Sequence, residues 1–228
     1  MYNPDVSTPL RLVLSGAGGR MGRAVAAAAA SDRRVRVVAG VGRATSPAEL
    51  SAAVAGADVL VDFSLPAASL TFARAAARAL VPVVSGTTGL SPAQTSALKA
   101  LAKAVPVFWA PNMSPGMNLL FELAARAARA LPGYDAAVVD VHHAAKKDAP
   151  SGTAKRLQAA LGRPSSVVSL RVGDVAGDHT VFLAGPGERL ELVHRAHSRE
   201  VFARGALAAA LWTARRRPGF YGMADLLK

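Results

Sequence analysis

The sequence predicts an α/β fold in which a doubly wound parallel sheet is followed by a smaller α+β domain. Three observations support this prediction. Short runs rich in β-branched residues alternate with Ala-rich helical stretches over the first half of the chain. A Gly-rich turn joins the first strand to the first helix. After residue 162, β-like runs follow one another with tight turns between them, which is typical of an antiparallel sheet.

The first half of the chain alternates strands and helices. We expect strands at 10–14, 35–39, 59–63, 81–84 and 105–109, and helices at 23–30, from 46, at 67–79 and at 91–103. Ser46-Pro47 and Ser91-Pro92 each give a helix an N-cap followed by proline in the first turn. This alternation favours parallel strands with right-handed crossovers.

The second half mixes the two kinds of element. We expect a long amphipathic helix at 117–130, a strand at 137–141, a helix at 154–161, β-like runs at 167–171, 179–184 and 188–194, and a last helix to about 216. The strand at 137–141 is rich in β-branched residues, and the turns at 174–178 and 185–187 separate the later runs.

Composition excludes several classes of protein. The 228 residues contain no cysteine, so disulfides and thiolate metal sites are excluded, and a reducing cytoplasm is favoured. We expect no metal site, and no apolar run is long enough to predict a membrane span. The net charge of +12 admits nucleic-acid binding, but its arginines are scattered without interleaved aromatics. Anionic small ligands explain this charge better, so we expect no nucleic-acid partner.

The Gly-rich turn occupies residues 15–22. Met21 takes the third position of the common G-x-G-x-x-G fingerprint, so G-x-x-G-x-x-G through Gly16, Gly19 and Gly22 is the better description. Glycines there let the turn close and let the backbone approach a pyrophosphate at the helix start, as in Rossmann-like folds. By itself the motif is also consistent with a tight strand-to-helix connection.

The chemistry of the sequence is concentrated in residues 140–153, D-V-H-H-A-A-K-K-D-A-P-S-G-T. His142 and His143 follow a strand and are expected to point to opposite sides. Histidine exchanges protons near neutral pH, and Lys146 supplies a neighbouring positive charge. The turn at 150–153 opens a helix, whose start attracts anions. Each of these residues alone is better explained as an ordinary surface or core residue. Together they suit a small anionic substrate that must be protonated.

This stretch closely resembles a known active-site signature. H-H-x-x-K-x-D-A-P-S-G-T-A, beginning at His142, is similar to that of the 4-hydroxy-tetrahydrodipicolinate reductase (dihydrodipicolinate reductase) family of the diaminopimelate–lysine pathway. The turn at 16–22, the loops at 86–88 and 110–116 and the C-terminal segment from 198 resemble other family segments. The chain departs from the family pattern at Asp140, commonly Glu, at Met113, commonly Phe, and at Gly42, where an acid is expected.

The resemblance implies a dinucleotide cofactor. The residues expected to bind it are Gly16, Ala17, Gly18, Gly19, Arg20, Met21, Arg43, Gly86, Thr87, Thr88, Ala110, Pro111, Asn112 and Met113. Dinucleotide folds often hold the ribose 2′-hydroxyl with an acid, and arginine suits a 2′-phosphate. Because Gly42 replaces the acid and Arg43 remains, we expect NADPH, with NADH possible.

The resemblance also implies an enzyme and the roles of its residues. We expect NAD(P)H-dependent reduction of 4-hydroxy-tetrahydrodipicolinate, with His142 as general acid and Lys146 assisting it. His143, Gly152 and Thr153 would bind the carboxylates of this cyclic dicarboxylate substrate. The alternatives are another NAD(P)-dependent reductase of a small imine or semialdehyde, and a dinucleotide-sensing regulatory protein.

Domain organisation and assembly are predicted in the same way. By resemblance, residues 1–114 and 201–228 form a dinucleotide-binding domain, and residues 115–200 form a substrate-binding and tetramerisation domain. We therefore expect a homotetramer in the cytoplasm.

Overall fold

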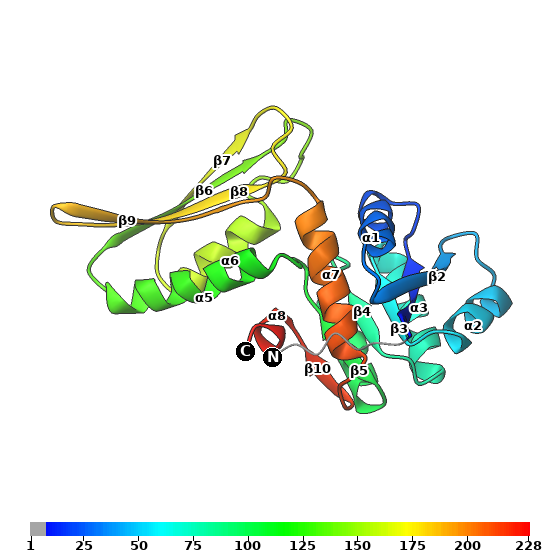
Figure 1. Cartoon of the computed structure of the whole chain (residues 1–228). Helices are drawn as coiled ribbons and strands as arrows, with labels where there is room; N and C mark the ends of the chain where they lie inside the picture. The colour runs from blue at the N-terminus through cyan, green and yellow to red at the C-terminus, as the bar shows by residue number, and fades with distance from the viewer. Residues whose placement is uncertain (1–7) are drawn as a thin grey trace. The chain divides into compact units, whose positions relative to one another are not determined.

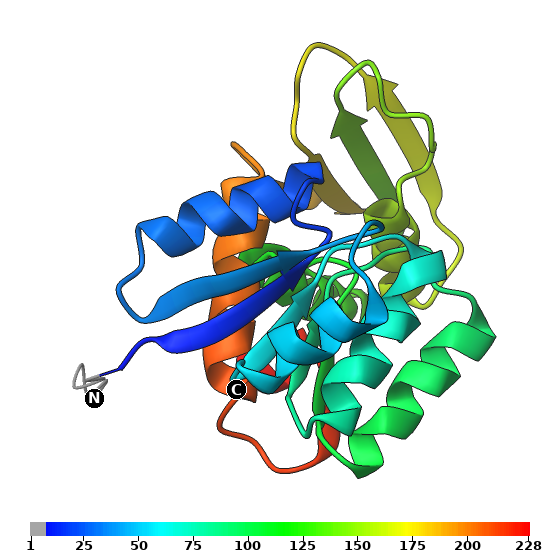
Figure 2. The same cartoon turned by 90° about the vertical axis from the view of Figure 1, so that its right-hand side faces the viewer.

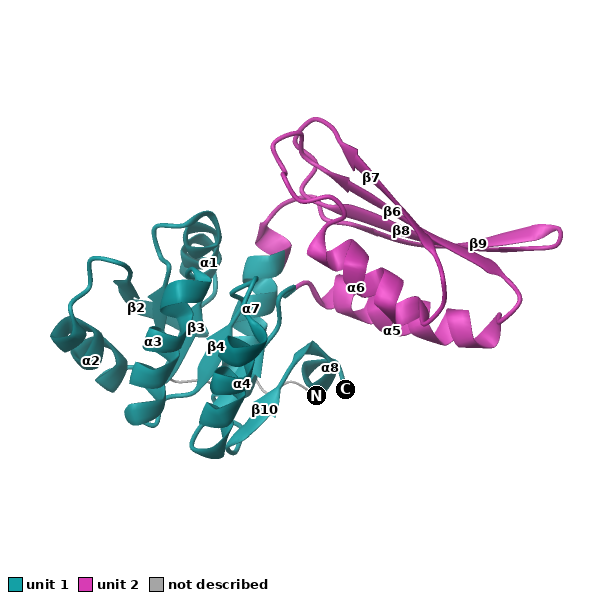
Figure 3. Cartoon of the chain, turned by 180° about the vertical axis from the view of Figure 1, so that it is seen from behind, with its two compact units in different colours: residues 1–113, 202–228 teal, residues 114–201 magenta. Residues whose placement is uncertain are grey.

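The computed structural model describes residues 8–228 and divides into two compact units (Figure 3). Within the described residues, unit 1 comprises 8–113 and Phe202–Lys228, and unit 2 comprises Ser114–Val201. The first seven residues of the predicted dinucleotide-binding domain lie outside the described residues.

Unit 1 is built on a six-stranded sheet in the order β10-β5-β4-β3-β1-β2, and every paired neighbour runs parallel. The strands are β1 (Leu10–Ser15), β2 (Val35–Val41), β3 (Val59–Asp62), β4 (Val83–Ser85), β5 (Pro106–Trp109) and β10 (Gly219–Tyr221). The order turns back at β1, which lies between β2 and β3. The crevice at the carboxyl ends of the strands, beside such a reversal, is where open α/β sheets bind ligands.

Helices cover both faces of this sheet (Figures 1 and 2). Apolar residues of α1 (Arg20–Ala30) and α7 (Glu200–Thr213) pack on one face. The other face is covered by α2 (Pro47–Ala55), α3 (Pro66–Arg78) and α4 (Pro92–Ala100). Two short helices complete the unit, η1 (Leu101–Lys103) and α8 (Met223–Leu226). Burial on both faces explains why the central strands are almost wholly apolar.

Two details of unit 1 differ from the sequence prediction. The first helix begins at Arg20, three residues earlier than expected, because Gly19 is its N-cap. The tail after Pro218 forms β10, which pairs with β5, and then α8. A three-residue strand that begins with glycine is too short for periodicity to reveal, and pairing with β5 supplies the hydrogen bonds that define it.

Unit 2 is a four-stranded sheet with two helices on one face (Figure 1). The strand order is β7-β6-β8-β9, with β6 (Asp135–His142), β7 (Ser166–Arg171), β8 (Asp178–Gly185) and β9 (Glu188–Arg195). The helices are α5 (Pro115–Ala130) and α6 (Gly152–Leu161). The expectation of an antiparallel sheet is wrong for one pair, since β6 and β7 run parallel. The α6 crossover between them requires this.

Candidate active site

The Gly-rich turn of unit 1 depends on two glycines. Gly16 has a positive φ of 74°, and a Cβ there would lie 2.5 Å from the backbone oxygen of Phe63. A Cβ on Gly22 would lie 2.2 Å from the oxygen of Gly16. Gly18 has open space instead. The structure thus requires glycine at the first and last positions of G-x-x-G-x-x-G. The open space at Gly18 leaves the turn accessible to a bulky anion.

A cavity of about 950 Å³ adjoins this turn. Gly16 to Gly19 form one wall, Gly42 and Arg43 follow β2, and residues of α2 and α3 close the remainder. Arg43 is exposed and supplies a positive charge at this cavity. Cavities of 300–1,000 Å³ are typical of small-molecule and cofactor sites. Its volume and lining therefore fit part of a dinucleotide.

A buried aspartate organises the carboxyl edge of the same sheet. Asp62, which ends β3, is fully buried and accepts hydrogen bonds from Ser15 (2.5 Å), Ser69 (2.5 Å) and Thr87 (2.8 Å). The backbone N–H of Ser64 donates to it at 3.0 Å. These donors come from the ends of β1 and β3, from α3 and from the loop after β4. Asp62 thereby ties the start of the Gly-rich turn to the Gly86–Thr88 loop.

The other predicted cofactor residues do not line the cavity. Thr87, Ala110 and Met113 are buried, at 2%, 3% and 2% exposure, and Met113 packs in the core beside α7. Met21 also packs against this core, whereas Arg20 is exposed at the first position of α1. The loops at 86–88 and 110–113 follow β4 and β5 at the carboxyl edge. The structure brings Arg43 together with Gly16 to Gly19, and leaves these other residues outside the cavity.

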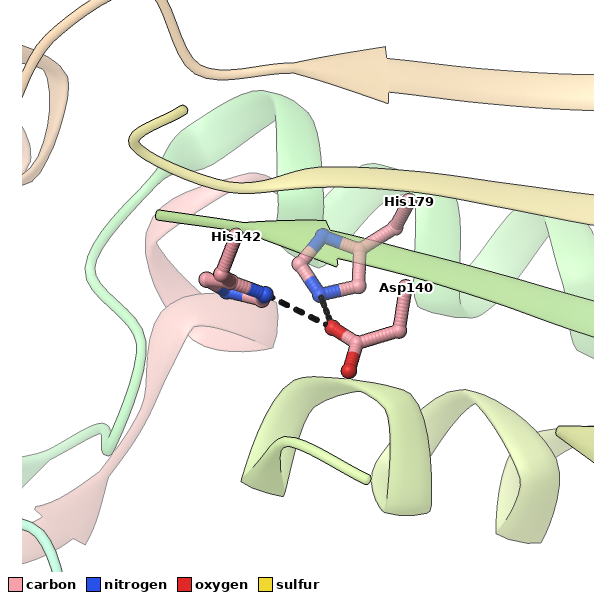
Figure 4. A group of neighbouring side chains, drawn as sticks. All are labelled: Asp140, His142 and His179. Atoms are coloured by element: carbon pink, nitrogen blue, oxygen red, sulfur yellow. Dashed lines mark ion pairs between the residues drawn. The ribbon is translucent and has the colours of Figure 1, made fainter. Parts of the chain in front are cut away.

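The main site of unit 2 surrounds the carboxylate of Asp140 (Figure 4). Asp140 and His142 are two residues apart on β6, so they share a face of the sheet. The Nδ1 of His142 lies 2.8 Å from Oδ1 of Asp140, and the Nε2 of His179 on β8 lies 3.3 Å from the same oxygen. All three side chains are buried. The predicted general acid is therefore held by a carboxylate and accompanied by a second histidine.

The second oxygen of Asp140, Oδ2, accepts three hydrogen bonds. Arg171 Nη2 and Ser169 Oγ, both on β7, donate to Oδ2 at 3.0 and 3.1 Å, and the backbone N–H of Ser151 donates at 3.1 Å. Burial disfavours the charged form, but hydrogen bonds from His142, His179 and Ser151 outweigh it and hold the pKa of Asp140 well below its usual range. Asp140 is therefore a carboxylate throughout the physiological pH range.

The loop between β6 and α6 carries the predicted assisting cation. The Nζ of Lys146 lies 2.7 Å from Oδ1 of Asp148, and the Lys146 side chain is 22% exposed. Partial burial of Asp148 is outweighed by this hydrogen bond, and the pKa of Asp148 is lowered. Arg171 also donates to the backbone oxygen of Asp148 at 2.6 Å, and the N–H of His143 donates to the oxygen of Val175 at 2.8 Å. The loop is thus anchored on both sides of Lys146.

The start of α6 follows this loop. Ser151 is the N-cap, and its Oγ accepts a hydrogen bond from the backbone N–H of Ala154 at 3.1 Å. Gly152 and Thr153 are the first two helical residues, and a Cβ on Gly152 would meet open space. The positive end of the helix dipole and an uncrowded first turn favour an anion here.

Sequence reasoning missed the residues that hold His142. Asp140 was noted only as a departure from the family pattern, and His179, Arg171 and Ser169 were not singled out. The spacing of Asp140 and His142 on a strand was a usable signal, since residues two apart share a face. The contributions of β7 and β8 depend on strand pairing, which a single sequence does not specify.

The cluster also has the composition of a metal site. The ligand atoms of Asp140, His142 and His179 lie within 4.8 Å of one another. However, the guanidinium of Arg171 lies 3.0 Å from the same carboxylate and would repel a cation. The arrangement is better suited to orienting histidine protons than to binding a metal ion.

Comparison with known families identifies the chain. The model of the dihydrodipicolinate reductase N-terminus matches residues 10–113, and that of the C-terminus matches residues 116–227. The chain belongs to the dihydrodipicolinate reductase family. This confirms the resemblance inferred from the signature at His142. Members of this family use NAD(P)H.

Full-length relatives agree. The chain is 46% identical to the 4-hydroxy-tetrahydrodipicolinate reductase of Stenotrophomonas maltophilia strain R551-3, over 97% of this chain and 99% of that protein. It is 41% identical to the enzyme of the same name from Anaeromyxobacter dehalogenans strain 2CP-1, over 95% of this chain and 97% of that protein.

Solved structures share the fold. A dihydrodipicolinate reductase from Paenisporosarcina sp. TG-14, solved with dipicolinate, matches with a TM-score of 0.82 and 21% identity, over 95% of this chain and 99% of that chain. A probable dehydrogenase from Thermotoga maritima matches with a TM-score of 0.67 and 11% identity, over 96% and 92% of the two chains. The predicted fold class is confirmed. Among residues 8–228, no helix is long and apolar enough to cross a membrane.

Proposed function

We propose that this chain catalyses the NAD(P)H-dependent reduction of 4-hydroxy-tetrahydrodipicolinate to tetrahydrodipicolinate in diaminopimelate and lysine biosynthesis. Full-length relatives with this activity in their names support the proposal. The observation that carries it is the convergence of the signature residues in unit 2. His142 is held by Asp140, and the same carboxylate binds the backbone of Ser151 at the start of α6. A proton donor and an anion site are thus fixed together.

The residues of unit 1 would hold the cofactor. Gly16 to Gly19 would receive its pyrophosphate at the start of α1, since glycine lets the backbone approach and the helix dipole favours anions. NAD(P)H would supply the hydride when bound. Arg43, at the same cavity as this turn, supports a preference for NADPH, because a guanidinium pairs with a 2′-phosphate.

The residues of unit 2 would bind and protonate the substrate. After the substrate has lost its 4-hydroxyl group as water and has accepted a hydride, His142 would donate a proton to the resulting enamine, and Lys146 would place positive charge beside the developing anion. His143, Gly152 and Thr153 would bind the two substrate carboxylates, the latter two through the start of α6. Dipicolinate, a planar dicarboxylate, is bound in the related Paenisporosarcina structure and supports a substrate of this class.

We also propose a cytoplasmic homotetramer assembled through the sheet of unit 2. Val168 and Val193 occupy one cross-strand row with Val139 and Thr180, on the face opposite the Asp140 row. They are 51% and 42% exposed, and Leu170 on the same face is 50% exposed. Apolar surface of this kind favours association. Val193→Glu is expected to reduce the mass measured by light scattering, whereas Arg126→Glu, at an exposed position of α5 on the other side of the sheet, is expected to leave it unchanged.

The function is tested by following NADPH and NADH oxidation while the preceding synthase makes substrate from pyruvate and aspartate semialdehyde. The parent protein is expected to turn over, and His142→Ala and Lys146→Ala are expected to lose kcat by about 10²-fold or more while still binding NADPH. A folded parent that binds the dinucleotide but does not oxidise it in this assay would contradict the proposal.

The cofactor preference has its own test. Arg43→Ala is expected to raise KM for NADPH by about tenfold and to leave KM for NADH nearly unchanged, because only a charge-assisted hydrogen bond to the 2′-phosphate is lost. Arg36→Ala, an exposed arginine of β2 that does not line the cavity, is the matched control. An equal effect of Arg43→Ala on both cofactors would contradict this assignment.

A further inference from the structure

A row of polar side chains crosses the sheet of unit 2 from edge to edge. Ser169, Asp140, His179 and His194 occupy directly opposed positions on β7, β6, β8 and β9. Directly opposed residues lie on the same face of a sheet. Leu192, two residues before His194, packs against the core beneath α5 and α6, so the row lies on the helix-covered face. Polar groups in such a place need partners.

Both helices of unit 2 begin at this row. Ser151, the N-cap of α6, lies 3.3 Å from Nε2 of His179 through its Oγ and donates its backbone N–H to Asp140 at 3.1 Å. Ser114, the N-cap of α5, lies 3.1 Å from Nε2 of His194 through its Oγ. The row therefore fixes the starts of both helices to the strand that carries His142.

The carboxylate of Asp140 determines the tautomer of His142, that is, which of its ring nitrogens carries the hydrogen. An ionised carboxylate only accepts hydrogen bonds, so the Nδ1 of His142, 2.8 Å away, carries a hydrogen. This leaves Nε2 to exchange a proton with a ligand. Gly177 lies beside that nitrogen, and a Cβ at this position would come within 3.1 Å of it. Glycine at 177 keeps the space next to Nε2 clear.

We propose that Asp140 and His179 are positioning residues for His142, a role that rests on the function proposed above. His142 and His179 contact the same oxygen of Asp140, and their rings meet edge to face with centroids 5.2 Å apart (Figure 4). Arg171 and Ser169 hold the other oxygen. With three donors on Oδ2, the carboxylate cannot turn away from His142. The proton donor then keeps a fixed position relative to the start of α6.

His179 contributes polar contacts to the row as well as packing. It is 4% exposed, and its Nε2 is within 3.3 Å of both Asp140 and Ser151. Loss of its imidazole would remove the nitrogen that lies 3.3 Å from both Asp140 and Ser151, and would let the carboxylate and the helix start move separately. Because His179 acts through Asp140, its loss is expected to reduce turnover without weakening cofactor binding in unit 1.

The test compares two substitutions of His179 in the full chain, with the synthase-coupled assay. Glutamine keeps an N–H near the position of Nε2, whereas leucine fills similar space without a donor. His179→Leu is expected to lower kcat about tenfold or more, with KM for NADPH unchanged, and to move the pH at which kcat declines. His179→Gln is expected to recover most of this loss. The exposed His197→Gln is the matched control.

Equal losses in the glutamine and leucine variants, or parent-like kcat in both, would overturn the proposal. A second measurement does not depend on turnover or on the stability of the leucine variant. Nitrogen-15 spectra of the imidazoles, with His142 assigned from a His142→Gln variant, report which ring nitrogen is protonated. We expect the Nδ1–H form in the parent and its loss in Asp140→Asn.

The two measurements separate this inference from the proposed function. An Nε2–H form of His142 in the parent would overturn the positioning role even if the enzyme turned over. An Nδ1–H form that depends on Asp140 and His179, in a protein that does not reduce the substrate, would support the positioning role and contradict the proposed function.

Discussion

The two units each contain a fully buried aspartate at the end region of a strand, but the partners of these carboxylates differ in kind. Asp62 in unit 1 accepts hydrogen bonds from serine and threonine hydroxyls and one backbone N–H. Asp140 in unit 2 is held by two histidines, Arg171, Ser169 and a backbone N–H. All of these donors to Asp62 are neutral, whereas Asp140 also contacts a guanidinium and two imidazoles, which carry or exchange protons.

The difference indicates what each buried charge is for. Neutral hydroxyl donors cannot change protonation near neutral pH, so the contacts of Asp62 can only fix the loops at the carboxyl edge of the sheet. Imidazoles can exchange protons there, so Asp140 determines where a mobile proton is held. Both clusters restrict loops, but only that of unit 2 can take part in acid–base chemistry.

The largest effects are expected from replacing each buried aspartate in turn. Asp140→Asn is expected to lower kcat by roughly 10²- to 10⁴-fold, as when a catalytic histidine loses its carboxylate and adopts the wrong tautomer. Its Kd for NADPH should stay within about twofold of the parent, since unit 1 is untouched. Stopped-flow turnover and fluorescence titration with NADPH measure the two quantities. A variant with parent-like kcat would contradict the assigned role of Asp140.

Asp62→Asn should give the opposite pattern. An amide in this position directs its N–H groups at hydroxyls and a backbone N–H that already donate, which costs about 1–3 kcal/mol for each buried group left unsatisfied. We expect weaker NADPH binding and a lower melting temperature, with kcat at saturating cofactor falling much less than in Asp140→Asn. Equal loss of kcat in both variants would show that the two clusters are not functionally separate.

Effects of intermediate size are expected from two glycines of the Gly-rich turn. Gly22→Ala is expected to abolish NADPH binding or destabilise unit 1, because its Cβ would lie 2.2 Å from the oxygen of Gly16 and backbone cannot give way cheaply. Gly18→Ala meets open space, so it should fold normally and weaken only cofactor binding. Thermal melting with and without NADPH distinguishes these outcomes. Normal folding and NADPH binding in Gly22→Ala would contradict the requirement for glycine at position 22.

Much of unit 1 could be predicted from the sequence because its signals are local. β-branched runs, Ser-Pro helix starts and glycine spacing are each contained in a few residues, and the prediction erred at the start of α1 and at β10, which is too short to show a pattern. The role of Asp62 was not predictable, because its donors lie 47 and 25 residues away in Ser15 and Thr87. Hydroxyls at such distances leave no periodic trace.

In unit 2 the residues of the active-site signature could be predicted from the sequence, but the pairing of the strands could not. His142, Lys146 and the start of α6 are contiguous, so one stretch revealed them together. The direction of β7 depends on the α6 crossover, and the opposition of Asp140 to His179 depends on strand register. Register is decided by packing of the whole sheet against α5 and α6, which the sequence of either strand does not contain.

The smallest expected effect is on the pH dependence of stability. This effect distinguishes the two units, because all five histidines lie in unit 2. Burial, followed by the nearby charge of His179, lowers the pKa of His194 below its ordinary value of 6.5. The unfolded chain therefore takes up a proton at His194 before the folded chain does. The contribution of His194 to stability is complete above about pH 6.5 and is lost as the pH falls toward its folded pKa.

Hydrogen exchange, corrected for intrinsic rates, should show protection in unit 2 falling between pH 7.5 and 5.5. His194→Gln should reduce that fall, because glutamine takes up no proton in this pH range. An unchanged pH dependence in His194→Gln would show that the other histidines, rather than the end of the row at Ser114, set the acid sensitivity of unit 2.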